Sequence, residues 1–189
     1  MAGRIKVGRW LPFVAEWQGD GRSFTWRARA AFGLLRVVDH YASPGDAGMN
    51  VRLLDRLRLV DAHDENTVRS AAGRTAIEGA FWAPMSLLPG QGAEWDAASE
   101  GEIVGAWDVA PERPEVHLRI APGGAIREGW VMRWKDIANG YVACGGAVHS
   151  ERRFGDLTIP NRVSVGWWFG TERYDPFFEA EIRDAQILR

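Results

Sequence analysis

The sequence predicts a mainly β fold (α+β): a single curved antiparallel sheet that forms a barrel or half-barrel, with one main helix across its opening. Short runs that alternate apolar and polar residues recur along the 189 residues, and a period of two is typical of half-buried strands. Turn residues separate most of these runs. Ten tryptophans, most of them in alternating runs, favour a cupped sheet around a cavity over a thin flat layer.

Twelve runs are predicted as strands, five before the helix and seven after it. The first five are 13–18, 23–31, 36–42, 49–54 and 58–62. The last seven are 94–98, 102–109, 115–121, 125–134, 147–154, 162–169 and 177–187. Pro122-Gly123-Gly124 lies between two of them and predicts a tight hairpin. An antiparallel sheet with this many strands curls, and other parts of the chain must fill its concave side.

The main helix is predicted over 67–81, with Asn66 as its N-cap and several alanines that favour helix. A short helical turn is predicted over 85–88, bracketed by two prolines. The segment 135–146 has the weakest pattern and is predicted as a rim loop. Residues 1–189 are expected to form a single domain with a ligand cavity.

Composition narrows the classes of function. The net charge is −2 with both signs interleaved, so no basic stripe indicates nucleic-acid binding. Strand arginines that alternate with apolar residues are interpreted as a solvated outer face; they are Arg27, Arg29, Arg52, Arg56 and Arg58. No apolar run approaches the length of a membrane span. A single cysteine, Cys144, and the lack of an apolar leader favour a cytoplasmic protein.

Standard catalytic motifs are not recognised in the sequence. The four histidines form no ligand pair, so neither a metal nor a cofactor is expected. Asp39 and Glu128 share alternating faces with aromatic residues and are the candidate catalytic groups. A carboxyl in an apolar cup has a raised pKa and can act as a general acid. The alternative is that one β-bulge turns Glu128 toward solvent.

The candidate substrate-binding residues are bulky side chains on the same predicted faces, together with two that follow the helix and would form a lid. They are Trp26, Tyr41, Trp82, Met85, Trp107, Trp130, Met132, Trp134 and Trp167.

Several motifs resemble an uncharacterised bacterial family with a helix followed by a Trp-x-Pro-x-x-Leu-Leu-Pro pattern. Here that pattern runs from Trp82 to Pro89, and Glu94-Trp95-Asp96 follows it. Two positions depart from the family: Ala83 replaces an aromatic residue, and Gly79 replaces an acidic one, with Glu78 beside it. The family is similar in fold to the half-barrels of lipoprotein carriers. The resemblance implies an apolar ligand held between a curved sheet and helices, and it implies no particular reaction.

Two functions remain open at this point. The first is a cofactor-free cyclase or isomerase of specialised metabolism, of the cycloaddition type, in which the cavity folds a polyene or polyketide into a reactive shape. The second is a non-catalytic carrier or sensor of a lipid or another hydrophobic ligand. A tightly packed structural protein without a ligand is a third hypothesis. The partner expected in the first two is an apolar small molecule, and the oligomeric state is left open.

Overall fold

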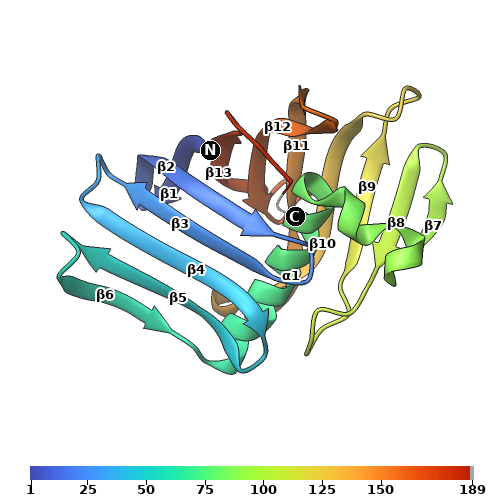
Figure 1. Cartoon of the computed structure of the whole chain (residues 1–189). Coiled ribbons are helices and arrows are strands. Elements are labelled where there is room, and N and C mark those ends of the chain that lie inside the picture. The colour runs from blue at the N-terminus through green and yellow to red at the C-terminus, as the bar shows by residue number, and fades with distance from the viewer. Residues whose placement is uncertain (188–189) are drawn as a thin grey trace.

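The first and last strands of the chain lie side by side in the middle of one antiparallel sheet (Figure 1). In the computed structural model, which describes residues 1–187, β1 (Ala2–Val7) pairs with β13 (Asp175–Glu181). Neighbouring strands then fan out on both sides as two meanders. The order across the thirteen strands is β6-β5-β4-β3-β2-β1-β13-β12-β11-β10-β9-β8-β7. Strands β6 and β7 are the two free edges, so the sheet is an open half-barrel.

The strands on the β1 side are β2 (Arg9–Gly19), β3 (Phe24–Ala30), β4 (Leu35–Ser43), β5 (Asp46–Leu53) and β6 (Leu57–Ala62). Those on the β13 side are β7 (Glu94–Ser99), β8 (Glu102–Ala106), β9 (Glu115–Ile120), β10 (Ile126–Lys135), β11 (Gly140–Phe154) and β12 (Leu157–Trp167). Three short 3-10 helices complete the structure: η1 (Pro84–Leu87), η2 (Pro89–Gln91) and η3 (Asp136–Ala138).

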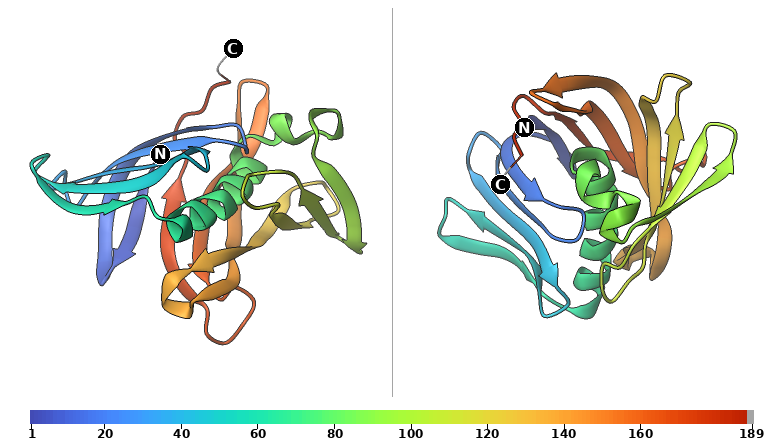
Figure 2. Two further views of the ribbon diagram at one scale, coloured as in Figure 1. Left: turned by 90° about the horizontal axis from the view of Figure 1, so that it is seen from below. Right: turned by 45° about the vertical axis from the view of Figure 1, so that its right-hand side comes forward.

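Helix α1 (Glu65–Trp82) connects one free edge of the sheet to the other and crosses the hollow of the half-barrel. Figure 2 shows the sheet curling around this helix. Its N-cap is Asp64, whose carboxylate accepts a hydrogen bond of 2.8 Å from the backbone N–H of Thr67. Small buried residues on the helix, among them Ala72 and Ala76, allow it to lie close against the sheet.

One cluster of buried residues fills the space between the helix and the concave face of the sheet. Alternation along the strands builds it: Trp26, Ala28 and Ala30 of β3 are buried, whereas Arg27 and Arg29 between them are exposed.

None of the described helices has both the length and the apolarity needed to cross a bilayer.

The predicted fold class, a curved antiparallel sheet with one main helix, is confirmed. The predicted hairpin at Pro122-Gly123-Gly124 joins β9 to β10. Several local predictions were wrong. Strand β1 was not predicted, and the segment 135–146 is not a rim loop throughout, because β11 begins at Gly140 and pairs with β10 from there. The helix begins at Glu65, two residues before the predicted Thr67, and its N-cap is Asp64 and not the predicted Asn66. The strand predicted over 177–187 ends at Glu181.

The face of β10 also differs from the prediction. Gly129 and Val131 are buried toward the helix, so Glu128 and Trp130 point to the other side. A register irregularity between Ile126 and Glu128 precedes them in the pairing with β9. Glu128 there forms an ion pair of 2.7 Å with Arg119. The expectation that Glu128 faces the cavity is therefore corrected.

Candidate functional site

A cleft opens where the two central strands of the sheet are shorter than their neighbours. The contact of β1 with β2 ends at the hydrogen bonds between Met1 and Ala15, whereas β2 runs on to Gly19. On the other side, β13 reaches only Arg162 of β12, which begins at Leu157. The two long strands consequently project past β1 and β13 and leave a notch in the middle of the sheet. Ile182 and residues 184–187 line this notch.

The cleft has a volume of about 930 Å³, which is within the range of sites for small molecules. Its apolar lining comes from β2, β3, β12, the end of α1 and the segments after α1 and β13. These residues include Trp17, Phe24, Trp82, Pro84, Ile159, Ile182 and Ile187. Its polar lining comes mainly from β2, β3 and β4. These residues include Glu16, Gln18, Ser23, Thr25, Arg27 and His40. Because side chains alternate along a strand, the apolar residues of β2 and β3 lie on the face toward the helix and the polar ones on the outer face. The cleft therefore reaches both faces of the sheet.

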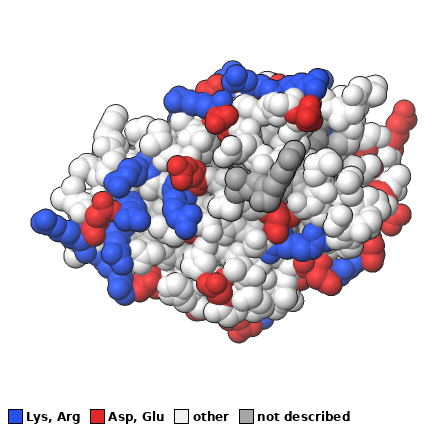
Figure 3. Space-filling model, viewed as in Figure 1, with Lys and Arg blue, Asp and Glu red and all other residues white. Residues whose placement is uncertain are grey.

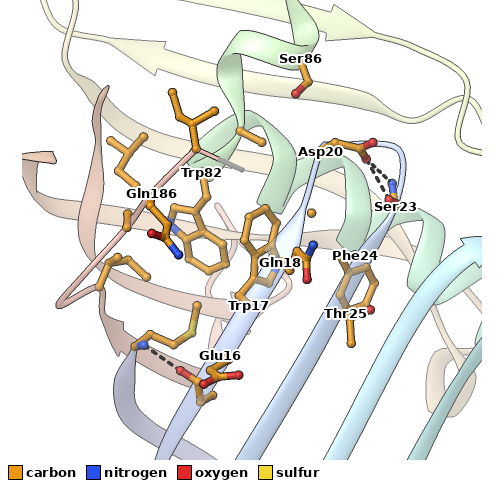
Figure 4. Close-up of a pocket in the computed structure, with 18 of the residues that line it drawn as sticks. Glu16, Trp17, Gln18, Asp20, Ser23, Phe24, Thr25, Trp82, Ser86 and Gln186 are labelled. Atoms are coloured by element: carbon orange, nitrogen blue, oxygen red, sulfur yellow. Dashed lines mark hydrogen bonds between the residues drawn. The ribbon is translucent and has the colours of Figure 1, made fainter. Parts of the chain in front are cut away.

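Trp17 and Trp82 form the aromatic part of the cleft (Figure 4). Their ring centroids lie 5.4 Å apart and the rings meet edge to face at 74°. Trp17 is anchored from behind, because its Nε1 donates a hydrogen bond of 2.7 Å to Glu78 of the helix. The Nε1 atom of Trp82 is buried and has no hydrogen-bond partner among the described residues. Buried polar groups in proteins usually have a hydrogen-bond partner, so this indole N–H is an unsatisfied donor.

The anchor of Trp17 continues into a buried ion cluster. Glu78 accepts a 2.7 Å hydrogen bond from Arg74, which also pairs with Asp39 of β4. The Arg74 guanidinium lies over the rings of Phe24 and Trp26. Desolvation opposes the charge on Arg74, but the two carboxylates outweigh it and raise its pKa above the usual value. Asp39 thus faces inward as expected, and it holds Arg74 in place instead of lining the cleft.

Three of the nine predicted substrate-binding residues line the cleft: Tyr41, Trp82 and Met85. The hydroxyl of Tyr41 donates a hydrogen bond to the carbonyl of Ala110, and burial raises its pKa. Met85 is 58% exposed at the rim, on η1. Trp17 was missed, although its alternation with Phe13 and Ala15 places it on the inner face and was visible in the sequence.

The other six predicted residues lie elsewhere. Trp26 and Trp107 are buried in the core, where Nε1 of Trp107 donates to the carbonyl of Gly21 at 2.8 Å. Trp130 stacks on His117 on the face away from the helix, with 4.8 Å between ring centroids.

Met132, Trp134 and Trp167 complete this group. Met132 is 53% exposed. Trp134 packs edge-on against Tyr141, and Trp167 stacks on Phe177. The tryptophans are thus divided between the core, the outer face and the cleft, because the strands that carry them turn different faces inward.

Cys144 is fully buried on β11. Burial raises the pKa of its thiol, against the opposing effect of the nearby Arg133 guanidinium. Because the thiolate is the reactive form, we expect the native protein to react with a disulfide reagent at pH 8 at least about 100-fold more slowly than the protein unfolded in guanidinium. Spectrophotometric labelling with Ellman's reagent measures both rates. Equal rates would show that Cys144 is accessible in the folded state.

Residues 1–187 contain no group of three or more His, Cys, Asp or Glu side chains placed to hold a metal ion. Glu78, which fixes Trp17, is engaged with Arg74.

Fold and cleft together define a class of protein: an open half-barrel with a cleft of about 930 Å³ beside its central strands. The chain belongs to a family of unknown function, DUF6920, whose model matches residues 1–186. The match covers the whole sheet, the helix and nearly all of the cleft. Comparison with curated proteins and with solved structures finds no match.

Proposed function

We propose that the protein is a non-catalytic carrier or sensor that binds one amphipathic molecule in the cleft. The observation that carries this proposal is the 930 Å³ cleft, which has the Trp17–Trp82 pair on the inner face of the sheet and polar residues on the outer face of β2 and β3. An apolar body lies against the indoles, and a polar head group reaches past the end of β1 to Gln18 on the outer face. The unmet N–H of Trp82 supports the proposal, since a ligand oxygen or a bound water satisfies it.

The geometry favours a carrier over a cyclase because the two candidate acids are not available to a ligand. Asp39 is 13% exposed and paired with Arg74. Glu128 lies on the far face of β10 and is paired with Arg119. A general acid must reach the reacting atoms within hydrogen-bonding distance, and neither carboxyl lines the cleft.

Replacing Gln18 with tryptophan is expected to fill part of the cleft and to weaken ligand binding at least about tenfold, since the added ring occupies the space of the ligand. Gln18 is exposed on the outer face of β2, so the substitution leaves the core intact. The probe is N-phenyl-1-naphthylamine, whose fluorescence rises in an apolar site, with oleate as competitor.

Glu115→Trp on β9 is the matched control, because Glu115 is an exposed strand residue outside the cleft. We expect saturable probe binding by the parent protein and by Glu115→Trp. Recovery of oleate chemically unchanged agrees with a carrier. Absence of saturable binding, or equal binding by Gln18→Trp, would contradict the proposed site.

A further inference from the structure

Four arginines stand in one row across the sheet on the face away from the helix. Arg29 of β3 is paired with Arg36 of β4, Arg36 with Arg52 of β5, and Arg52 with Arg58 of β6. Neighbouring strands lie about 4.8 Å apart, so the row extends over about 14 Å. Figure 3 shows Lys and Arg gathered over this part of the sheet. Arg56, in the β5–β6 turn, adds a fifth exposed cation.

Acidic neighbours neutralise the row only in part. Asp55 lies 3.5 Å from Arg29 and 3.6 Å from Arg36, and Asp61 pairs with Arg58. The five arginines thus have only two carboxylates, Asp55 and Asp61, as paired acidic neighbours. Like charges directly opposite one another on adjacent strands are destabilising. An anionic partner would relieve this repulsion, and exposed ion pairs are weak enough to rearrange for it.

Exposed apolar side chains surround the row. Phe32, at the tip of the β3–β4 hairpin, is 94% exposed, and Leu34 beside it is 49% exposed. The β5–β6 hairpin adds Leu54, which is 61% exposed. The two tips lie side by side, because the backbone N–H of Leu54 donates a 2.8 Å hydrogen bond to the carbonyl of Leu34. Together with Leu59 of β6, which is 51% exposed, these side chains form an apolar rim next to the arginines.

We propose that this surface, the arginine row with its apolar rim, docks on the surface of an anionic phospholipid bilayer. The arginines meet lipid phosphates, and the rim enters the interfacial region between head groups and acyl chains. The cleft is partly lined by Arg27 and Thr25, which lie on the same outer face of β3. Docking therefore directs this side of the cleft toward the lipid. The inference depends on the sheet surface alone and stands whether or not the cleft binds a ligand.

Two other partners fit the surface less well. A nucleic acid also offers phosphates, but its bases stack on aromatic rings, and three of the four rim residues are leucines. A second copy of the chain would bring two arginine rows together, and their repulsion opposes that contact. The combination of cations with aliphatic side chains favours a lipid surface.

Vesicle flotation tests the charged part of the surface. We expect the protein to float with vesicles of phosphatidylcholine and phosphatidylglycerol, and not with phosphatidylcholine alone. Raising the ionic strength from about 0.1 M to about 1 M shortens the screening length to about 3 Å and releases it. Arg36→Gln/Arg52→Gln is expected to bind about 30-fold more weakly, since each surface cation contributes roughly fivefold.

The matched control is Arg152→Gln/Arg153→Gln, which removes the same charge from exposed residues near the end of β11; we expect its binding to equal that of the parent. Phe32→Asn/Leu54→Asn tests the rim. Both residues have positive φ, +59° and +52°, which asparagine tolerates well, so the fold is retained. This variant is expected to bind anionic vesicles at least about fivefold more weakly at unchanged thermal stability.

Three results would overturn the proposal. The first is equal flotation with neutral and anionic vesicles, or none with either. The second is an equal effect of the two arginine double variants. The third is evidence for another partner. Tighter binding to a single-stranded oligonucleotide than to vesicles would assign the surface to nucleic acid. Salt-sensitive dimerisation that Arg36→Gln/Arg52→Gln strengthens would assign it to self-association.

Discussion

Replacing Arg74 with methionine is expected to destabilise the protein by about 3–5 kcal/mol, because it leaves the carboxylates of Asp39 and Glu78 buried without their cation. All three side chains are largely enclosed, with 12% of Arg74 and 13% of each carboxylate side chain exposed. The guanidinium also packs over Phe24 and Trp26, with 4.7 Å and 5.1 Å to the ring centroids. Chemical denaturation at pH 7, followed by circular dichroism, measures the change in the free energy of unfolding.

A second substitution identifies the cause, because the loss is attributed to two buried carboxylates left without their cation. Adding Asp39→Asn to the variant removes one of the charges and is expected to recover part of the loss at pH 7.

Arg69→Met is the matched control on the same helix. Arg69 pairs with Glu65, one turn earlier, and these side chains are 33% and 74% exposed. Solvent screens such a pair, so its loss is expected to cost about 1 kcal/mol or less. If the two substitutions cost the same, the buried cluster does not stabilise the fold as argued.

Replacing Gly79 with alanine is expected to destabilise the protein by about 3 kcal/mol, at the upper end of the usual cost of overpacking. A Cβ at this position would lie inside van der Waals contact of the Gly21 Cα and 3.0 Å from its nitrogen. Backbone atoms cannot rotate away as a flexible side chain does. Gly21 is held in place because it has a φ of +79° and accepts the hydrogen bond of Trp107. The helix must therefore move away from the β2–β3 turn.

The expected sign is opposite to that of an unconstrained helix, in which alanine stabilises by up to about 1 kcal/mol over glycine. Gly90→Ala serves as the control, because an added Cβ there meets nothing within 4 Å, and we expect a change within about 0.5 kcal/mol. Thermal denaturation of both variants checks the pair. A Gly79→Ala protein as stable as the parent would show that the helix does not approach the turn this closely.

Local elements of this fold were predictable because their causes are local. Alternation at Phe24-Thr25-Trp26-Arg27 and the Pro-Gly-Gly turn at residue 122 are properties of neighbouring residues. The prediction of which face a side chain occupies failed where a single irregular residue in a strand decides it. The irregularity next to Glu128 reversed the assignment of a face, since a slip of one residue exchanges the two faces of a strand.

The sequence alone determined that the chain forms a curved antiparallel sheet with one covering helix, because apolar periodicity and turn residues specify element type and which side chains share a side. Only the tertiary structure revealed the cleft and the arginine row. The cleft lies where β1 and β13, which pair residues as far apart in the sequence as Arg4 and Glu179, are flanked by β2 and β12. The arginine row exists because strand pairing places one arginine of each of four strands opposite the next, with an irregularity beside Arg52 that brings Arg58 into the row. Both features depend on which strands become neighbours and where their pairing ends, and those are properties of long-range contacts.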